Sequence, residues 1–393
     1  MSEATTPVRS SGRILTTHAG SLPRPKDLVD LYAKRSGGEI IDDDLLMREA
    51  SAATRAAVTK QLEVGIDIPN NGEQAREAFF LYVQRRMSGF GGQAPRKPWG
   101  DLLNYPEFSE ASGLSFSSKT MVSNRNPATA IGEVRHIAPE ANLAEINDFK
   151  SALKEAGGNF TDTFMTAPSP GMITIAMQNR YYKTDSDYLD DVAEALRVEY
   201  EAAVNNGMIL QIDAPDLAME RHMAFYEQPL EEFISFVRRV VVRINRVLRN
   251  IPKERVRMHV CWGNYEGPHD CDVALREILP FLLEANVGGL MLSFANPRHS
   301  HEVKVLKDIP IGPDQYIVAG VIDTLTNFVE HPEVVAERIE RAAECIGDPT
   351  RVLAGTDCGF DTAAGMGRVT ADVVWAKLRA LREGAEIASR RLF

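Results

Sequence analysis

The stretch RVRMHVCWGN, residues 255–264, decides the fold and locates the chemistry of this chain. Side chains on a β-strand alternate between its two faces, so His259 and Cys261 would share one face while the apolar residues between and before them occupy the other. The pattern therefore predicts a strand that packs on one side and presents an imidazole and a thiol on the other, near the end of the strand.

An imidazole and a thiolate two residues apart suit zinc, which prefers nitrogen and sulfur donors in tetrahedral geometry. We expect the third donor to be Cys358, which ends another apolar run, VLAGTDCGF. Because Cys358 lies far along the chain from Cys261, this set is typical of an enzyme site assembled from distant strands. Donors in a zinc finger lie close together in sequence.

A structural interpretation competes with this one, since free cysteines are usually buried and a lone histidine is usually structural. A second His-x-Cys pair, His269 and Cys271, repeats the spacing. It follows Gly267-Pro268 and is expected to open a helix, where side chains at i and i+2 diverge. We therefore expect this second pair not to bind a metal.

Composition narrows the function. The chain has 393 residues with 44 basic and 55 acidic side chains, a formal charge of −11, which argues against non-specific binding of nucleic acid or membrane surfaces. Its partners are expected to be small molecules, and the sequence is also compatible with a homo-oligomer. Four cysteines without a disulfide-like spacing, no signal peptide and no long apolar run predict a reducing, cytoplasmic location.

Strand and helix patterns alternate along the chain, which predicts a parallel sheet of an α/β fold. Strands are expected at 14–17, 65–69, 128–134, 162–167, 208–215, 256–261, 288–293, 316–322 and 352–357, and helices at 42–64, 187–205, 230–249, 272–284, near 302, 332–345 and 370–388. Nine strands are one more than a TIM (β/α)8 barrel needs, so we place 128–134 off the barrel.

The expected domain organisation is simple. A flexible tail, residues 1–13, precedes a single barrel domain, residues 14–393. Residues 74–127, rich in glycine and proline, are expected to form a long excursion after the second strand. We expect this excursion to act as a lid or as an oligomer contact.

Six polar residues fall at the carboxyl ends of predicted strands, which is the face where TIM-barrel enzymes keep their active sites. They are Ser21, Glu73, Asp213, His259, Cys261 and Cys358. Any one of them could be a turn or capping residue, but convergence of all six at one face indicates a site.

In the motifs HAGSLPRP, GIDIPNNGEQ, LQIDAP, HVCWGN and AGTDCGF, the chain resembles the catalytic domain of cobalamin-independent methionine synthase. The same motifs resemble the wider group of zinc thiol alkyltransferases that includes epoxyalkane:coenzyme M transferase. The resemblance covers nearly the whole chain. It implies a zinc ion on His259, Cys261 and Cys358, with Ser21, Glu73 and Asp213 holding the amino-acid part of homocysteine.

The sequence departs from the synthases on the methyl-donor side. The glutamate zinc ligand expected near Ser293 is absent, and the histidine expected to protonate the departing folate is Leu325. The acidic pterin contact falls on Met219. A tryptophan expected after PSPG is missing, and the synthases' N-terminal half, which helps to bind the folate tail, has no counterpart in these residues.

The sequence therefore predicts a zinc-dependent S-alkyltransferase that activates a small thiol for attack on a methyl or alkyl donor other than methyl-tetrahydrofolate. Three alternatives stay open. Epoxide opening by a thiol is a close rival. A zinc-free barrel similar to uroporphyrinogen decarboxylases would need arginine clusters for its substrate carboxylates. A thiol- or zinc-binding protein without turnover is the third.

Overall fold

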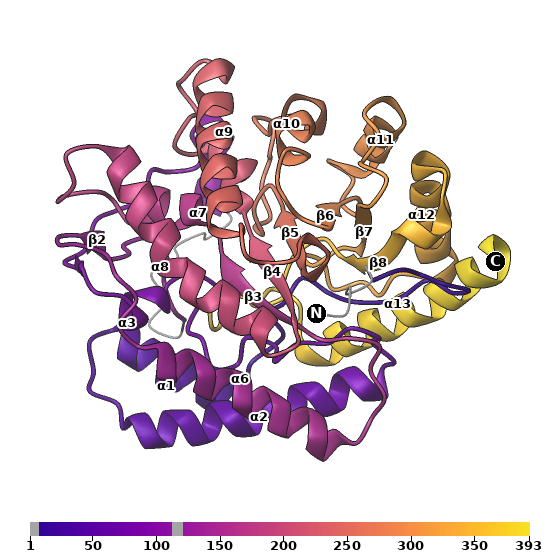
Figure 1. Ribbon diagram of the computed structural model, residues 1–393, viewed down its shortest axis with the longest axis horizontal. Coiled ribbons are helices and arrows are strands. Elements are labelled where there is room, and N and C mark those ends of the chain that lie inside the picture. The colour runs from indigo at the N-terminus through magenta and orange to yellow at the C-terminus, as the bar shows by residue number, and fades with distance from the viewer. Residues whose placement is uncertain (1–7, 112–120) are drawn as a thin grey trace.

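The computed structural model describes residues 8–111 and 121–393, and its centre is a parallel sheet with the strand order β3-β4-β5-β6-β7-β8. These strands are β3 (Phe164–Pro168), β4 (Ile209–Asp213), β5 (Val256–Val260), β6 (Gly289–Ser293), β7 (Tyr316–Ile322) and β8 (Val352–Thr356). Every residue in them is buried, because helices cover the outside of the sheet and side chains fill its inside. Figure 1 shows the helices arranged around these strands.

Two extended segments close the ring between β8 and β3. Thr17 N donates to Ala354 O (2.9 Å), and Ile68 N donates to Thr16 O (3.0 Å). On the far side of the second segment, Phe164 N donates to Pro69 O (3.0 Å). Segments 14–17 and 66–69 thus occupy the first two positions of an eight-membered (β/α)8 barrel, as the sequence predicted, although their hydrogen bonding is sparser than that of the six strands.

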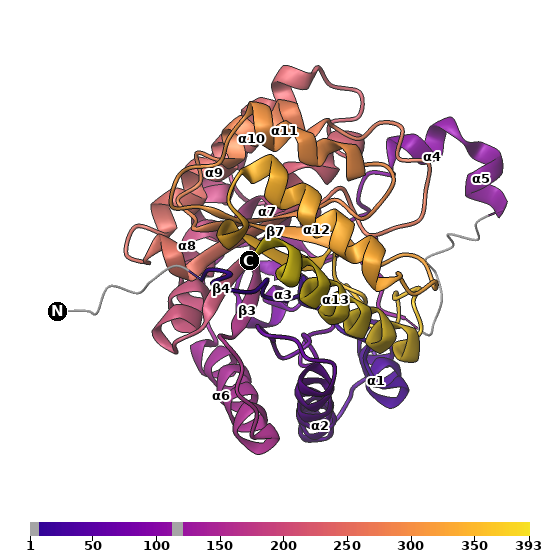
Figure 2. The ribbon, with the colours of Figure 1, turned by 90° about the vertical axis from the view of Figure 1, so that its right-hand side faces the viewer.

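The helices that surround the barrel match the predicted pattern in most places. The long ones are α1 (Lys26–Ser36), α2 (Asp43–Glu63), α6 (Pro139–Ala156), α8 (Asp185–Asn205), α9 (Leu230–Val247), α10 (Leu275–Leu282), α12 (Pro332–Ile346) and α13 (Ala371–Leu392). Short helices are α3 (Val83–Arg86), α4 (Gly100–Asn104), α5 (Pro106–Ala111), α7 (Pro170–Ala176) and α11 (Val305–Asp308). Figure 2 shows α13 and α12 lying side by side on one flank. In the described part of the chain, no helix is long and apolar enough to span a bilayer.

Two layers of apolar contacts stabilise the barrel. The larger one lies between the sheet and the helices, where β-branched strand residues meet the apolar helix faces. The smaller one fills the barrel itself and includes Leu15, Ile68, Phe164, Met291 and Val318. Polar side chains also enter the barrel: Arg257 lies over the ring of Phe164 and donates to Gln211.

Several predictions about local structure need correction. The pair β1 (Phe90–Gly91) and β2 (Thr129–Ala130) is antiparallel and lies off the barrel, so 128–134 was placed correctly but its strand is only two residues long. Helix α10 begins at Leu275 and not at 272, and His269 does not open a helix, because its backbone is left-handed with a φ of 53°. Helices α1, α6 and α7 were not predicted.

The predicted tail and the predicted excursion are described only in part. Residues 1–7 and 112–120 lie outside the described residues. In the rest of the tail, Ser10 N donates to Thr350 O (3.0 Å) and Ser10 Oγ donates to Val352 O (2.6 Å), so the chain is held at Ser10 against the start of β8. The excursion contains α3, β1, α4 and α5, and part of it reaches the carboxyl face of the barrel.

Candidate metal and thiol site

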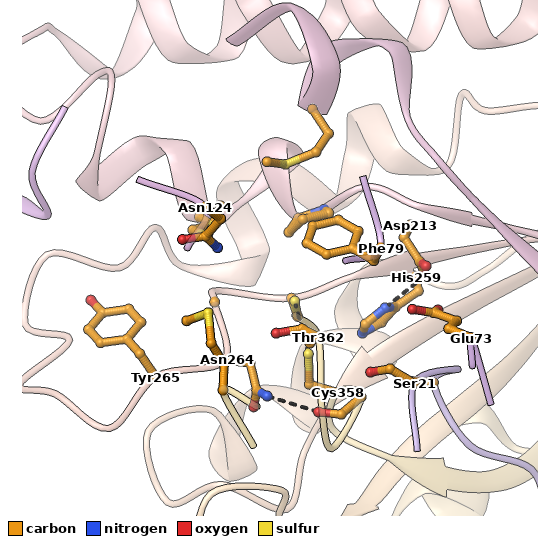
Figure 3. A pocket seen from close by; sticks show the side chains of 18 of the residues that line it. Ser21, Glu73, Phe79, Asn124, Asp213, His259, Asn264, Tyr265, Cys358 and Thr362 are labelled. Atoms are coloured by element: carbon orange, nitrogen blue, oxygen red, sulfur yellow. Dashed lines mark hydrogen bonds and ion pairs between the residues drawn. The ribbon is translucent and has the colours of Figure 1, made fainter. Parts of the chain in front are cut away.

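The two cysteines and the histidine of the predicted donor set meet at the carboxyl end of the barrel. His259 is the second-last residue of β5, Cys261 directly follows β5, and Cys358 lies two residues after β8. The sulfur atoms of Cys261 and Cys358 are 3.8 Å apart, and one donor atom from each of the three residues lies within 4.8 Å of the others. All three are buried. Figure 3 shows His259 and Cys358 at the centre of the cavity.

The three groups strongly affect one another's protonation. The hydrogen bond between the sulfurs lowers the pKa of Cys261 well below its usual range, against the effect of burial, whereas the same hydrogen bond and burial together raise the pKa of Cys358. Burial lowers the pKa of His259, but the Cys261 charge and the hydrogen bond to Asp213 outweigh it and raise that pKa to about 10. Two thiols and an imidazole in contact form the nitrogen and sulfur donor set that zinc prefers, and zinc would displace their protons.

A chain of hydrogen bonds orients His259. Nδ1 of His259 donates to Oδ1 of Asp213 (3.2 Å), which also accepts from Nε2 of Gln211 (2.8 Å). Nε of Arg257 in turn donates to Oε1 of Gln211 (2.8 Å). Nε2 of His259 lies 3.2 Å from the backbone oxygen of Asp357, which can only accept, so a metal bound at Nε2 would take the place of this hydrogen bond.

Ser21, Glu73 and Asp213 line the same cavity on one side of His259 (Figure 3). Oε1 of Glu73 accepts from Thr166 Oγ1 (2.9 Å), whereas Oε2 is buried without a partner among the described residues. Burial, and after it the charge of Asp213, raises the pKa of Glu73 to about 7, although Arg76 and Arg24 oppose this. Gly20, with a φ of 132°, allows this approach, because a Cβ there would lie 2.6 Å from Glu73 Oε1.

The position expected for the synthases' glutamate ligand holds Ser293 at the end of β6. Oγ of Ser293 donates to the backbone oxygen of Asp357 (2.8 Å) and makes no contact with a cysteine sulfur that the structure records. The carboxylate of Asp357 cannot substitute for it. Asp357 Oδ1 accepts from the backbone N–H groups of Phe294 and Ala295, and Oδ2 accepts from that of Asn296.

The far side of the cavity was not predicted from the sequence. The cavity is open to solvent and has about 730 Å³ of empty space with that opening included. Its other lining residues include Phe79, Arg96, Trp99, Asn124, Met172, Met219, Asn264, Tyr265, Thr362 and Met366. Figure 3 shows Asn124 and Tyr265 across the cavity from Glu73. Trp99 comes from the excursion and stacks on Tyr265, with ring centroids 4.7 Å apart. The excursion therefore supplies an aromatic wall, even though the tryptophan expected after β3 is absent.

Other residues singled out in the sequence lie elsewhere. Leu325 lines a neighbouring small cavity and not the large one. The second His-x-Cys pair stays apart from the first: Cys271 Sγ lies 3.2 Å from Asp270 Oδ1, and His269 contacts Asp272 and Tyr265. The side chains of His269 and Cys271 therefore do not meet at one potential metal site.

No protein-family model matches the chain, but whole-length relatives exist. A methionine synthase of Thermococcus kodakarensis is 28% identical over 381 residues, which cover 96% of this chain and 94% of that protein. A methionine synthase of Sulfurisphaera tokodaii is 27% identical over 348 residues, covering 88% of this chain and 85% of that protein.

Solved structures agree on the fold. A B12-independent methionine synthase from Shewanella sp. W3-18-1, in complex with selenomethionine, superposes with a TM-score of 0.69 at 19% identity, covering 97% of this chain and 99% of that one. A putative vitamin-B12 independent methionine synthase from Listeria monocytogenes gives 0.63 at 23% identity, covering 98% and 99%. Over nearly its whole length the chain is thus similar in sequence to proteins named methionine synthase, and it shares the fold of the B12-independent methionine synthases.

Proposed function

We propose that the protein is a zinc-dependent S-methyltransferase or S-alkyltransferase that activates a small thiol. The observation that carries this proposal is the meeting of one imidazole and two cysteine sulfurs, all buried, at one end of a large cavity. Full-length relatives named methionine synthase support transfer of a methyl group to a thiol as the class of reaction.

His259, Cys261 and Cys358 would hold the zinc ion. Bound zinc would lower the pKa of a coordinated substrate thiol enough to make it a thiolate at neutral pH. Asp213 contributes by fixing the hydrogen of His259 on Nδ1. With two thiolates and a neutral imidazole, the donor set itself has a charge of −2, which balances Zn²⁺ before a substrate binds.

Ser21, Glu73 and Asp213 would hold the amino-acid part of the thiol substrate. The two carboxyl groups face the cavity beside His259, and the free oxygen of Glu73 is placed to accept a hydrogen bond from an ammonium group. A buried carboxylate without a cationic partner is unfavourable, so a bound ammonium group would satisfy it. Homocysteine has the required thiol and amine, and the names of the relatives point to it.

The alkyl donor would occupy the opposite side, between Phe79, Trp99 and Met219. The substrate thiolate attacks the alkyl carbon there, a carbon–sulfur bond forms, and the bond to the leaving group breaks with its electron pair. Leu325 provides no proton for that leaving group. We therefore propose a donor whose leaving group needs little help from an acid, and not methyl-tetrahydrofolate.

An epoxide fits the same requirement and is the second candidate. Its strained ring opens with less help from an acid than methyl-tetrahydrofolate requires. The apolar wall of Phe79, Met172 and Met366 would accept an alkyl substituent. A decarboxylase that binds several carboxylates is less favoured, because Arg96 is the one arginine among the described lining residues and it pairs with Glu220 at 2.5 Å.

The test is to incubate the zinc-loaded protein with homocysteine, or another small thiol, and a panel of methyl donors and epoxides. Mass spectrometry should detect a thioether for at least one donor. Cys261→Ser should abolish it, whereas Cys345→Ser, a buried cysteine of α12 away from the cavity, should not. Metal-free protein with full turnover would refute the zinc dependence, and a loaded protein that forms no thioether would favour a non-catalytic binding role.

A further inference from the structure

A second group of potential metal donors lies outside the cysteine site. Oδ1 of Asp272 is 2.8 Å from Nδ1 of His222 and 3.1 Å from Nδ1 of His269. His222 comes from the 3-10 helix η2 (Met219–His222), and His269 and Asp272 come from the loop between β5 and α10. Both histidines are buried, and the three donor atoms lie within 4.8 Å of one another.

The hydrogen of His269 can be assigned from its surroundings. Its Nε2 lies 3.0 Å from the backbone oxygen of Tyr265, which can only accept, so Nε2 must carry the hydrogen. In the neutral ring, Nδ1 then carries a lone pair and no hydrogen, and this atom faces the carboxylate of Asp272. Burial lowers the pKa of His269, with Asp272 opposing the change, which favours the neutral ring.

The same reasoning applies to His222 through Tyr265. The Tyr265 hydroxyl donates to Oδ2 of Asp101 (2.6 Å), a carboxylate oxygen that also accepts from the backbone N–H of His269 (2.9 Å). Tyr265 Oη is therefore left as an acceptor for Nε2–H of His222, 3.4 Å away. Nδ1 of His222, like Nδ1 of His269, therefore carries a lone pair. This buried atom makes no hydrogen bond of acceptable geometry in the described residues.

Two imidazole lone pairs and one carboxylate oxygen thus point at one another. Such an arrangement is repulsive unless positive charge lies between them. We propose that His222, His269 and Asp272 form a second metal site, for a divalent ion of the zinc class. Metal-binding histidines commonly donate their other ring N–H to a carbonyl or similar acceptor, as both histidines do here.

The spacing of the donors supports this assignment. Tetrahedral donors about 2.0–2.2 Å from a zinc ion lie roughly 3.3–3.6 Å from one another, so the distances of 2.8 and 3.1 Å between Asp272 and the two rings would have to widen only by about half an ångström to admit the ion. The other carboxylate oxygen of Asp272 is already engaged, because it accepts from His299 Nε2 (2.8 Å) and Arg298 (3.2 Å). Asp272 would therefore offer one oxygen to the ion.

The site would fix a wall of the main cavity. Tyr265 and Met219 both line that cavity, and the proposed donors lie in the two segments that carry them. An ion on His222, His269 and Asp272 would join η2 to the loop after β5 and hold Tyr265 against Trp99. The left-handed backbone of His269, with a φ of 53°, directs its ring into this junction.

Metal content of the purified protein tests the proposal. After incubation with zinc chloride and gel filtration, the wild type should carry about two zinc ions per chain. His269→Gln and His222→Gln should each carry about one and lose the second ion, whereas His301→Gln, a change at an exposed histidine, should keep both. Cys261→Ser should lose only the ion of the cysteine site, which separates failure of the proposed function from failure of this inference.

Cobalt gives an independent readout. Cobalt bound at the cysteine site should show sulfur-to-cobalt charge-transfer absorption, and a second equivalent should bind without increasing it. Crystals of the zinc-loaded wild type should show anomalous density between His222, His269 and Asp272, a measurement that needs no variant. One equivalent of metal in the wild type, with no anomalous density at this place, would overturn the proposal.

Discussion

Asp213 and His259 are paired in register on β4 and β5, and the carboxylate of the first accepts a hydrogen bond from the ring of the second at 3.2 Å. The residue that the family resemblance assigns to the substrate amine is therefore also in contact with a proposed zinc donor. This double contact makes the effect of substitutions at Asp213 informative, because charge and hydrogen bonding can be removed separately.

Asp213→Asn should weaken binding of an amino-acid thiol about 10-fold or more while zinc stays bound. The amide oxygen can still accept from His259, but the negative charge that would attract an ammonium group is gone. Isothermal titration with homocysteine, alongside zinc analysis, measures both effects. Asp213→Leu should in addition lower zinc affinity by roughly 10–100-fold. Unchanged thiol affinity in Asp213→Asn would assign Asp213 to positioning of His259 alone.

Cys358→Ser should lose the ion of the cysteine site. A serine hydroxyl is a much poorer zinc donor than a thiolate, and only His259 and Cys261 would remain. Zinc bound to the protein in competition with a chelator gives the comparison, and Cys345→Ser is the matched control. If Cys358→Ser retained zinc at this site with wild-type affinity, the donor set proposed here would be wrong.

Glu73 should make the protein's stability and ligand binding depend on pH. Its pKa is raised from 4.5 to about 7 in the folded protein, so its stabilising contribution is complete below about 4.5 and is lost as the pH rises through 7. Glu73→Gln should therefore be more stable than the wild type at pH 8, by roughly 1–3 kcal/mol, and the difference should shrink toward pH 5. Chemical denaturation at the two pH values measures this.

Binding should change in the opposite direction. If the Glu73 carboxylate accepts the substrate ammonium group, the affinity for methionine, a product without a titrating thiol, should increase as the pH rises through about 7. Glu73→Gln should bind weakly at every pH. A wild-type affinity that does not vary between pH 6 and 8 would remove Glu73 from the amine site.

Methyl-tetrahydrofolate should be a poor donor. A general acid is typically worth about 10²- to 10⁴-fold in rate, and Leu325 leaves none at the position where the synthases carry a histidine. Methionine formation from this folate should be far slower than from a donor with a better leaving group, at equal enzyme and homocysteine. Turnover at about 1 per second or more would show that another residue supplies the proton.

Much of the barrel follows from local patterns. The strands β4 to β8 lie in short apolar runs, and each was located to within about two residues because a fully buried strand requires such a run. Helices α1, α6 and α7, which lie outside the excursion, were not predicted. Helix α7 is seven residues long, too short to show a clear helical period.

The donor side of the cavity could not be predicted in the same way. Trp99 stacks on Tyr265 through a contact between a loop of the excursion and the loop after β5, and neither segment has a periodic pattern. His222 reaches Asp272 through the turn of η2, a geometry that no sequence spacing reveals. By contrast, Cys261 and Cys358 were paired correctly in space, because both end strands of a parallel ring.

The first and last strands of the ring meet where Ala19 N donates to Thr356 Oγ1, a contact that spans 337 residues. Contacts between such distant parts of a chain form slowly, since a long loop must close before they contribute. During synthesis the N-terminal segment must therefore wait for β8 before it has a neighbour on that side. Cys358 lies two residues after the end of β8, so ring closure and completion of the cysteine donor set belong to the same late folding event.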